Sequence, residues 1–435
     1  MKALGIIWEI PAKVFDMREQ SKPNIVLILM DNLGSSDIGP YGAQDIRTPR
    51  LDQLAREGVR LTQCYSNGAV CTPARAALMT GLYPGRVGLE GNVLRGEPEK
   101  GLSPSEITIA RMLKDNGYAT ALFGKWHLGF KPEQGPNAHG FDQFFGFLDF
   151  SIDYYSHESI DGQPALYEDT ELVEQDGYIT DLITDRALSF ISQHAHEPFF
   201  TFVSYNAPLP PRQPPNRPDD VRTPQTWFNL NRQDYVSVIE RVDEGIGRIL
   251  DTLNTNDLSE NTIVIFASDH GGVSDISNNG QFFHGFSTLW EGGIRVPCVI
   301  RWPGHLPAGT DSDQTTILAD LTASILTATN TDQPENRGLD GMNVFPILAG
   351  SEPAVERTFF WRMNIPGRQQ TAMRQGRWKL MLDGGVGPLM TRLLFNIEED
   401  VSERHNLAHQ YPDVLDRLLQ ELTRWETDIA ETAPA

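Results

Sequence analysis

The chain has little cysteine, few basic residues and no long apolar run, and each shortage excludes a class of protein. Only three of its 435 residues are cysteines, Cys64, Cys71 and Cys298, and none forms a CxxC pair, so a disulfide framework is not expected. No apolar run reaches the length of a membrane span. Lysine and arginine number 36 against 58 aspartate and glutamate residues, a formal net charge of −22. Such a chain repels nucleic acid and anionic membrane, so we expect neither as a partner.

The first twenty residues also lack the features of a signal peptide. Their one apolar patch, Leu4–Trp8, is soon interrupted by Glu9 and Pro11, and no small-residue cleavage site follows. We therefore expect a cytoplasmic protein. Hydrophobic residues at 40% and charged residues at 22% are typical of a globular chain, and its length allows a large core.

Apolar strands alternate with amphipathic helices along most of the chain. Ile25–Met30 and Thr262–Ala267 are short continuous apolar runs, typical of strands buried on both faces. Repeated strand–helix units predict an α/β fold with a mostly parallel central sheet flanked by helices. Further strands are predicted at 118–123, 199–204 and 297–301, and helices at 48–58, 103–117, 178–194, 233–253 and 315–329.

The pattern changes after about residue 345. Short antiparallel strands are predicted at 358–363, 370–373, 378–382 and 394–396, with a closing helix at 411–427. We therefore predict two domains, a main α/β domain over residues 22–345 and a smaller C-terminal α+β subdomain over residues 346–435.

The stretch CTPARAALMTG, Cys71–Gly81, predicts a reactive side chain at the beginning of a helix. Pro73 suits the first helical position, and Gly81 suits the C-terminal stop. Cys71 would then lie where free backbone N–H groups and the helix dipole favour an anion, and Arg75 adds a positive charge. A buried cysteine before an ordinary core helix is the alternative interpretation.

Polar residues follow the two apolar strands at their carboxyl ends. Asp31 and Asn32 follow the first strand, and Asp269 and His270 follow the second. Parallel neighbours would bring these ends together, and two carboxylates in one pocket call for a divalent cation. Oxygen ligands suit calcium or magnesium, while His270 leaves manganese open. Taken singly, each aspartate could instead cap a helix.

The Cys71–Gly81 string resembles the signature of the type I, formylglycine-dependent sulfatases, Cys-x-Pro-x-Arg-x-x-x-Met/Leu-Thr-Gly, at every fixed position. The resemblance covers roughly residues 22–408. It implies an alkaline phosphatase/sulfatase-like fold and arylsulfatase-like hydrolysis of a small-molecule or carbohydrate sulfate ester. Four further blocks are similar to family blocks: Pro23–Asp31, Gly124–Gly129 (GKWHLG), Ser268–Gly271 and Glu291–Pro297.

The resemblance also implies a cofactor and a partner. In that family a maturation enzyme oxidises the cysteine to formylglycine, an aldehyde whose hydrate is the nucleophile, so Cys71 would be modified by such an enzyme. The implied ligands of one divalent cation, expected to be calcium, are Asp31, Asn32, oxidised Cys71, Asp269 and His270. Arg75 would steady the hydrated aldehyde, Lys125 would bind sulfate, and His127 would take the proton whose loss expels sulfate.

The chain departs from the family pattern at three positions. Asn32 stands where a second aspartate is usual. Leu209 stands in the place of the histidine that protonates the leaving group, and Phe286 in the place of a second sulfate-binding lysine, and neither can donate a proton. His284 lies close enough in sequence to be a substitute catalytic acid. These departures leave two alternatives open, a phosphate or phosphonate ester hydrolase of the same superfamily and a non-catalytic relative that binds sulfated ligands.

Overall fold

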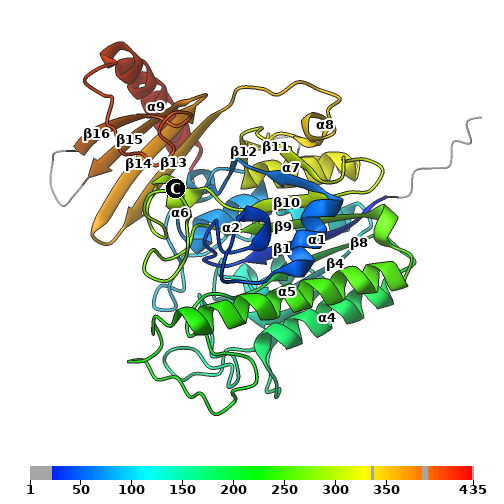
Figure 1. Cartoon of the computed structure of the whole chain (residues 1–435). Coiled ribbons are helices and arrows are strands. Elements are labelled where there is room, and N and C mark those ends of the chain that lie inside the picture. Colours follow the sequence, from blue (N-terminus) through cyan, green and yellow to red (C-terminus); the bar gives the residue numbers. More distant parts are fainter. Residues whose placement is uncertain (1–21, 335–337, 385–389, 434–435) are drawn as a thin grey trace, which may run out of the picture.

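The computed structural model describes residues 22–334, 338–384 and 390–433 (Figure 1). The predictions made for residues 1–20 lie outside this part. A ten-stranded sheet forms the centre, in the order β11-β2-β10-β9-β1-β8-β4-β5-β6-β7, and a four-stranded sheet lies beside it. Within the described residues, no helix has both the length and the apolar character needed to cross a bilayer.

The elements follow the predicted alternation of strands and helices. The strands of the large sheet are β1 (Asn24–Met30), β2 (Val59–Leu61), β4 (Ala119–Lys125), β5 (Gln143–Phe147), β6 (Tyr167–Glu168), β7 (Glu171–Leu172), β8 (Phe199–Ser204), β9 (Thr262–Ser268), β10 (Cys298–Arg301) and β11 (Thr310–Ser312). Strands β3 (Cys64–Tyr65) and β12 (Thr316–Ile317) form a separate pair. The helices are α1 (Pro49–Glu57), α2 (Cys71–Thr80), α3 (Ile109–Asp115), α4 (Ile179–Gln193), α5 (Arg232–Thr255), α6 (Glu291–Ile294), α7 (Leu318–Ala328), α8 (Phe345–Leu348) and α9 (Pro412–Thr432).

The centre of the large sheet is parallel and covered on both faces. β1 pairs in parallel with β8 and β9, and β4 pairs in parallel with β8 and β5, whereas β10 and β6 run antiparallel to their neighbours. Alternate residues of β1 enter two different cores: Leu27 packs with α2, α3 and α7, and Ile28 packs with α1, α4 and α5. Helices α4 and α5 therefore lie on one side of the sheet and α7 on the other (Figure 1). The predicted fold class is confirmed.

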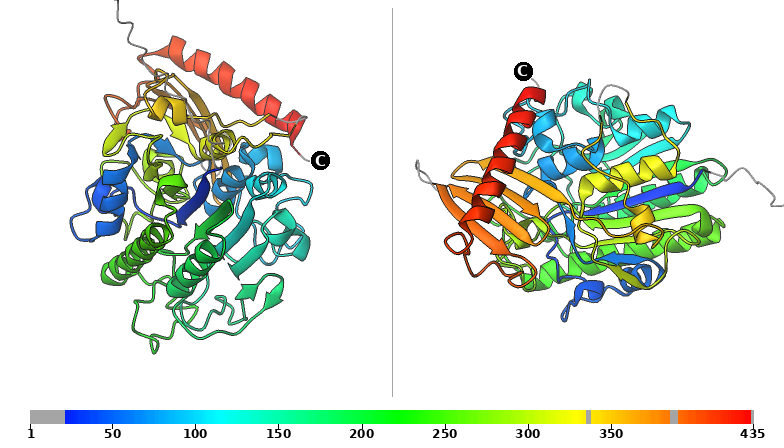
Figure 2. Two further views of the ribbon diagram at one scale, coloured as in Figure 1. Left: turned by 90° about the vertical axis from the view of Figure 1, so that its right-hand side faces the viewer. Right: turned by 90° about the horizontal axis from the view of Figure 1, so that it is seen from above.

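The C-terminal region is an antiparallel sheet covered by one long helix. Its strands are β13 (Thr358–Ile365), β14 (Arg368–Gln375), β15 (Trp378–Gly384) and β16 (Met390–Asn396), paired in sequence order. Helix α9 lies across this sheet (Figure 2). Its Leu418 and Leu422 belong to the same core as the apolar residues of the sheet. Trp361 of β13 donates its indole N–H to the carbonyl of Ser66 at 2.7 Å, which ties this sheet to the main body. The division at residue 345 stays a prediction.

Two local predictions were wrong in register. The helix predicted to begin at Ser103 begins six residues later, because Thr108 and not Ser103 caps it: the Thr108 hydroxyl accepts from the Arg111 N–H. The Ser103 hydroxyl instead bonds Ser105 within a turn. Helix α2 begins at Cys71 itself, so Pro73 is its third residue rather than its first.

Candidate active site

The two polar strand ends meet in the centre of the large sheet. The register of β1 and β9 pairs Met30 with Ser268, so Asp31 and Asp269 follow side by side. The N–H of Asp269 donates to the carbonyl of Met30 at 3.0 Å, which fixes the two turns against each other. Both aspartate side chains are fully buried. The carboxyl edge of the parallel strands thus places two carboxylates in one site, where α/β sheets bind their ligands.

Cys71 and His270 complete a cluster with these two carboxylates. One potential ligand atom from each of the four residues lies within 4.8 Å of the others. The Sγ of Cys71 is 3.3 Å from Nε2 of His270 and 3.7 Å from Oδ1 of Asp31. The Nδ1 of His270 lies 3.0 Å from the carbonyl of Gly271, which orients the ring so that Nε2 points into the cluster.

Asn32 borders the cluster in a backbone conformation that few residues tolerate. Its φ is +69°, a region that asparagine adopts more readily than most non-glycine residues. Its N–H donates to Oδ1 of Asp269 at 3.2 Å, while its buried side-chain oxygen has no hydrogen-bond partner among the described residues. A buried acceptor without a partner is costly, and a cation beside it would remove that cost. Amide and carboxylate oxygens together with one imidazole therefore fit a divalent cation.

Two buried cations neutralise the carboxylates. Arg75 donates from Nη2 to Oδ2 of Asp31 at 2.8 Å and from Nε to Oδ2 of Asp269 at 3.2 Å. Lys125 lies 2.6 Å from the same oxygen of Asp31. Burial favours the protonated form of Asp31, yet the charges of Lys125 and Arg75 outweigh burial and hold its pKa below the ordinary value. The four charges cancel formally, so a bound divalent cation would leave the site positive and suited to an anion.

The Cys71 thiol is a poor nucleophile as it stands. Burial, together with the negative charges of Asp31 and Asp269, raises its pKa well above the ordinary value. The thiolate is the reactive form of cysteine, and at neutral pH this site holds very little of it. The position at the beginning of α2 is nevertheless well fixed, because the side-chain oxygen of Asn92 accepts the next N–H, that of Thr72, at 3.0 Å.

His127 presents a free lone pair to the same site. Its Nε2 lies 3.2 Å from the carbonyl of Val93, which can only accept, so Nε2 carries the proton. Its Nδ1 is buried and has no partner among the described residues. Burial and the charges of Lys125 and Arg75 hold the pKa of His127 well below its ordinary value. His127 is therefore neutral and able to accept a proton at Nδ1.

A cavity of about 220 Å³ opens over Cys71, and its far wall is apolar. Its lining residues are Asn32, Cys71, Asn92, Leu94, His127, Phe150, Leu209, Pro210, Arg212, Phe228, Leu230, Val273 and Phe286. Leu209 is buried in the wall, and the ring of Phe286 packs on that of His270 at 4.9 Å between centroids. All three departures from the family pattern therefore line the cavity, and two of them, Leu209 and Phe286, make it less polar.

The suggestion that His284 leans into this cavity is wrong. His284 is exposed, and it does not line the cavity over Cys71. Its φ of +56° turns the side chain onto two aromatic rings, Phe283 at 4.2 Å and Trp290 at 5.8 Å between centroids. A side chain at the adjacent Gly285 would collide with the carbonyl of Gly272, so the backbone of this turn packs closely against its neighbour. The structure brings together the other residues proposed for the site.

Sequence reasoning singled out neither of two polar lining residues, Asn92 and Arg212, nor the apolar residues of the cavity wall other than Leu209 and Phe286. Asn92 lies twenty residues after Thr72, whose N–H its side-chain oxygen accepts. No sequence pattern links the two positions. Arg212 lies in a proline-rich loop after β8 where no local pattern marks it.

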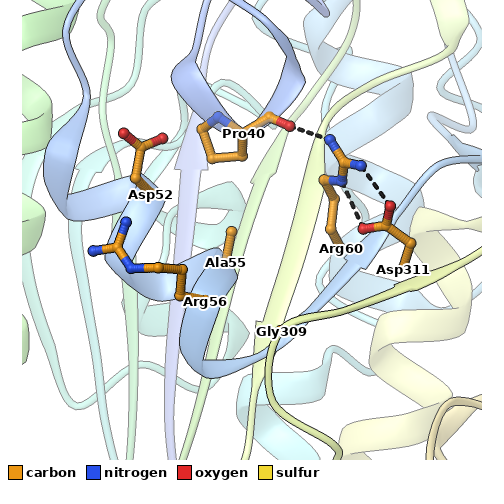
Figure 3. Close-up of a pocket in the computed structure, with 7 residues that line it drawn as sticks. All are labelled: Pro40, Asp52, Ala55, Arg56, Arg60, Gly309 and Asp311. Atoms are coloured by element: carbon orange, nitrogen blue, oxygen red, sulfur yellow. Dashed lines mark hydrogen bonds and ion pairs between the residues drawn. The ribbon is translucent and has the colours of Figure 1, made fainter.

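A second hollow of about 290 Å³ lies at the β2–β11 edge of the sheet (Figure 3). Its most prominent charged pair is Arg60 and Asp311, with Nε to Oδ1 at 2.8 Å, and Arg60 also donates to the carbonyl of Pro40. Asp311 neutralises this arginine, and the pair is partly exposed. The hollow therefore holds a surface ion pair rather than a group of reactive side chains.

Comparison with known proteins agrees with the geometry over Cys71. The Sulfatase family model matches residues 23–331. N-acetylgalactosamine-6-sulfatase of Sus scrofa is 31% identical over 371 residues, covering 79% of this chain and 69% of the relative. Arylsulfatase of Hemicentrotus pulcherrimus is 33% identical over 383 residues, covering 82% and 67%. The crystal structure of Ps i-CgsB in complex with k-i-k-neocarrahexaose superposes with a TM-score of 0.85 at 31% identity, covering 93% of each chain.

Proposed function

The chain belongs to the sulfatase family and hydrolyses a sulfate ester, and from this premise we propose that it acts on a small-molecule or carbohydrate ester through a formylglycine at position 71, with calcium as its cation. The observation that carries the proposal is the buried cluster of Asp31, Cys71, Asp269 and His270, which opens onto a cavity and is flanked by Arg75 and Lys125.

Position 71 becomes reactive when Cys71 is oxidised to formylglycine. A separate maturation enzyme, using its own oxidant, carries out a two-electron oxidation at Cβ that replaces sulfur by oxygen and releases sulfide. The hydrated aldehyde then offers a hydroxyl to the sulfur of the ester. The unmodified thiol would not serve, because its raised pKa keeps it protonated.

The chain's own residues bind and orient the ester. Lys125 and Arg75, which both donate to Asp31, would hold sulfate oxygens near position 71. The Asp31, Asn32, Asp269 and His270 side chains would hold calcium, which when bound would withdraw electron density from the sulfate oxygens. These fixed charges stabilise the charge that develops when the S–O bond to the alcohol breaks.

His127 completes the cycle as a base. The neutral ring with a free Nδ1 takes the proton of the second hydroxyl at position 71, which reforms the aldehyde and releases sulfate. The low pKa of His127 keeps it available as a base over the whole neutral range.

The leaving-group side of the cavity has no dedicated acid. Of its lining residues only Cys71, His127 and Arg212 are titratable, and Leu209 stands where an acid would be useful. General acid catalysis typically contributes about 10²–10⁴-fold. We therefore expect esters of acidic phenols to react faster than esters of unactivated alcohols. The carbohydrate part of the proposal is supported by the sugar sulfate in the name of the Sus scrofa relative and by the oligosaccharide complex of Ps i-CgsB.

The test is sulfate release by protein produced together with a formylglycine-generating enzyme. Aryl sulfates and monosaccharide sulfates should be cleaved, chelation should abolish turnover, and calcium should restore it better than magnesium or manganese. Turnover of a phosphonate monoester or phosphate diester at a rate well above that of every sulfate ester would overturn the proposal.

A further inference from the structure

Arg212 carries a positive charge inside the cavity that no carboxylate neutralises. Its side chain is only 3% exposed, and it lines the cavity together with Cys71 and Phe286. Its described hydrogen bonds run to two carbonyls, from Nε to Pro208 at 2.9 Å and from Nη1 to Asn229 at 3.5 Å. Among the described residues it forms no ion pair.

Among the described buried arginines Arg374 also lacks an ion pair, but it donates to the hydroxyl of Tyr65 and to Oε1 of Gln63. Two other largely buried arginines are paired with carboxylates. Arg75 contacts Asp31 and Asp269, and Arg222 contacts Asp220 and Asp234. Burial of a charge without a partner costs several kcal/mol, so such a charge persists where another interaction repays it. Burial accordingly lowers the pKa of Arg212, with only neutral tyrosine hydroxyls nearby to oppose the shift.

One terminal nitrogen of the guanidinium has no partner among the described residues. Nη2 donates to no described residue, yet it is not among the enclosed polar atoms that lack a partner, so it remains accessible from the cavity. The backbone holds Arg212 at φ +51°, a region that costs a non-glycine residue free energy and is found preferentially where a ligand is bound. The planar fork of a guanidinium matches the two oxygens of a carboxylate or sulfate.

Arg212 lies apart from the groups that would hold the reacting sulfate. Arg75 donates to the carboxylates of Asp31 and Asp269, whereas Arg212 donates to the carbonyls of Pro208 and Asn229 in the loop after β8. Arg75 and Arg212 would therefore contact different parts of one ligand.

The cavity wall beside Arg212 is suited to packing against a ring of the ligand. Phe150 and Phe228 lie nearly parallel, with an interplanar angle of 8° and 6.4 Å between centroids. Phe228 and Leu230 are 55% and 50% exposed although they line the cavity, so the rim presents apolar surface to an incoming ligand. Flat apolar faces of this kind stack on aromatic rings and on the C–H faces of sugars.

We propose that Arg212 binds a second anionic group, a sulfate or a carboxylate, on the alcohol half of the substrate, while the ring that bears it packs on Phe228 and Leu230. This inference rests on the proposed function. It makes Arg212 a specificity-determining residue: it selects esters that carry two anionic groups over those that carry one.

The experiment compares three matched esters, phenyl sulfate, carboxyphenyl sulfate and phenylene bis-sulfate, the last two as meta and para isomers. Arg212→Met should lower kcat/KM for the doubly anionic esters by about 10- to 100-fold, the range expected for a charge-assisted hydrogen bond. The value for phenyl sulfate should stay within about twofold. Arg212→Lys should restore part of the loss, because it keeps the charge without the fork. Comparison of the carboxyphenyl sulfates with the phenylene bis-sulfates shows whether Arg212 prefers a carboxylate or a sulfate as the second anionic group.

The matched control is Arg217→Met, which removes an exposed arginine from the same loop and should change none of the values. Equal losses on all esters, or equal values for Arg212→Met and wild type, would overturn the inference while leaving the proposed function standing. If wild type cleaves no sulfate ester, the proposed function fails. Calorimetric titration with hydroxyphenyl sulfate and hydroxybenzoate then still tests Arg212, since unchanged binding in Arg212→Met would overturn the inference.

Discussion

Buried charges gather at the carboxyl ends of β1 and β9 and again between the two sheets, but the surroundings of the two groups differ. The catalytic cluster consists of Asp31, Arg75, Lys125, Asp269 and His270. The interface cluster consists of Tyr65, Glu291, Arg295, Lys379 and Glu403. Each has a fully buried lysine that contacts carboxylates.

The interface cluster is closed. Lys379 lies 2.9 Å from Oε1 of Glu291 and 2.8 Å from Oε1 of Glu403, and Tyr65 donates to the other oxygen of Glu291 at 2.5 Å. The N–H of Glu291 donates to Glu403 at 2.6 Å. These bonds join β3 and α6 of the main body to β15 and the segment that follows β16. The charges are satisfied by one another, and their role is to hold the two sheets together.

The catalytic cluster is open. It borders a cavity, and two of its neighbours, Asn32 Oδ1 and His127 Nδ1, have no partner among the described residues. Buried charge alone therefore does not identify a reactive site. Access to a cavity distinguishes the two clusters, and substituting residues in them should affect activity in one case and stability in the other.

The largest effect is expected at Cys71. Cys71→Ala should lower kcat by about 10⁴-fold or more, because it removes the only position at which the nucleophile can form. The thermal unfolding midpoint should change little. Cys64→Ala is the control, since Cys64 is equally buried but lies in β3 away from the cavity. Loss of turnover in both variants would show that the effect is one of folding.

The two buried lysines give the sharpest contrast. Lys125→Met should lower kcat/KM for sulfate esters by about 10²–10³-fold, as for loss of one preorganised donor. Lys379→Met should leave the kinetics of the folded protein unchanged but lower the free energy of unfolding by about 3–5 kcal/mol, because Glu291 and Glu403 lose their shared partner. Urea titration and steady-state kinetics on both variants measure this. If both variants lost kcat/KM and free energy of unfolding to the same extent, the two clusters would not differ in role.

The interface cluster should also make stability depend on pH. Burial, and then repulsion by Glu291, outweigh the attraction of Lys379 and raise the pKa of Glu403 from 4.5 to about 7. Between these values the folded state keeps a proton that the unfolded state has lost, so stability falls as pH rises through this window. Glu403→Gln should remove that fall. Urea midpoints measured from pH 4.5 to 7.5 test it, and an unchanged slope in the variant would assign the dependence to another group.

The smallest effect is expected at His284. His284→Ala should change kcat/KM by less than about twofold, because the side chain is exposed and packs on Phe283 and Trp290 outside the cavity. Esters of poor leaving groups are the most sensitive substrates for this measurement. A tenfold loss confined to those esters would restore His284 as an acid.

Local patterns explain how much of the fold was predictable. β8 was predicted to the residue, because six apolar and small residues are bounded by Pro198 and a polar turn. The start of α3 was misplaced because Ser103 and Thr108 both suit an N-cap, and only tertiary contact decides between them: the Thr108 hydroxyl also donates to the carbonyl of His139.

The site was predictable where a strand end or a motif fixes a residue, and not elsewhere. Asp31 and Asp269 follow apolar strands, so their meeting follows from the parallel sheet. Arg212 and Lys379 have no such signal. Arg212 is buried because its loop lines the cavity, and Lys379 is buried because its strand, β15, packs against the main body. Burial of this kind depends on distant contacts that a local pattern does not contain.

We propose that position 71 acts as an oxidised residue over a cation. Mass spectrometry of the peptide that contains position 71, from protein purified in active form, tests it most directly when paired with kcat on the same samples. We predict that formylglycine replaces cysteine and that kcat rises in proportion to the converted fraction. Full activity in protein whose Cys71 is entirely unmodified thiol would contradict the account.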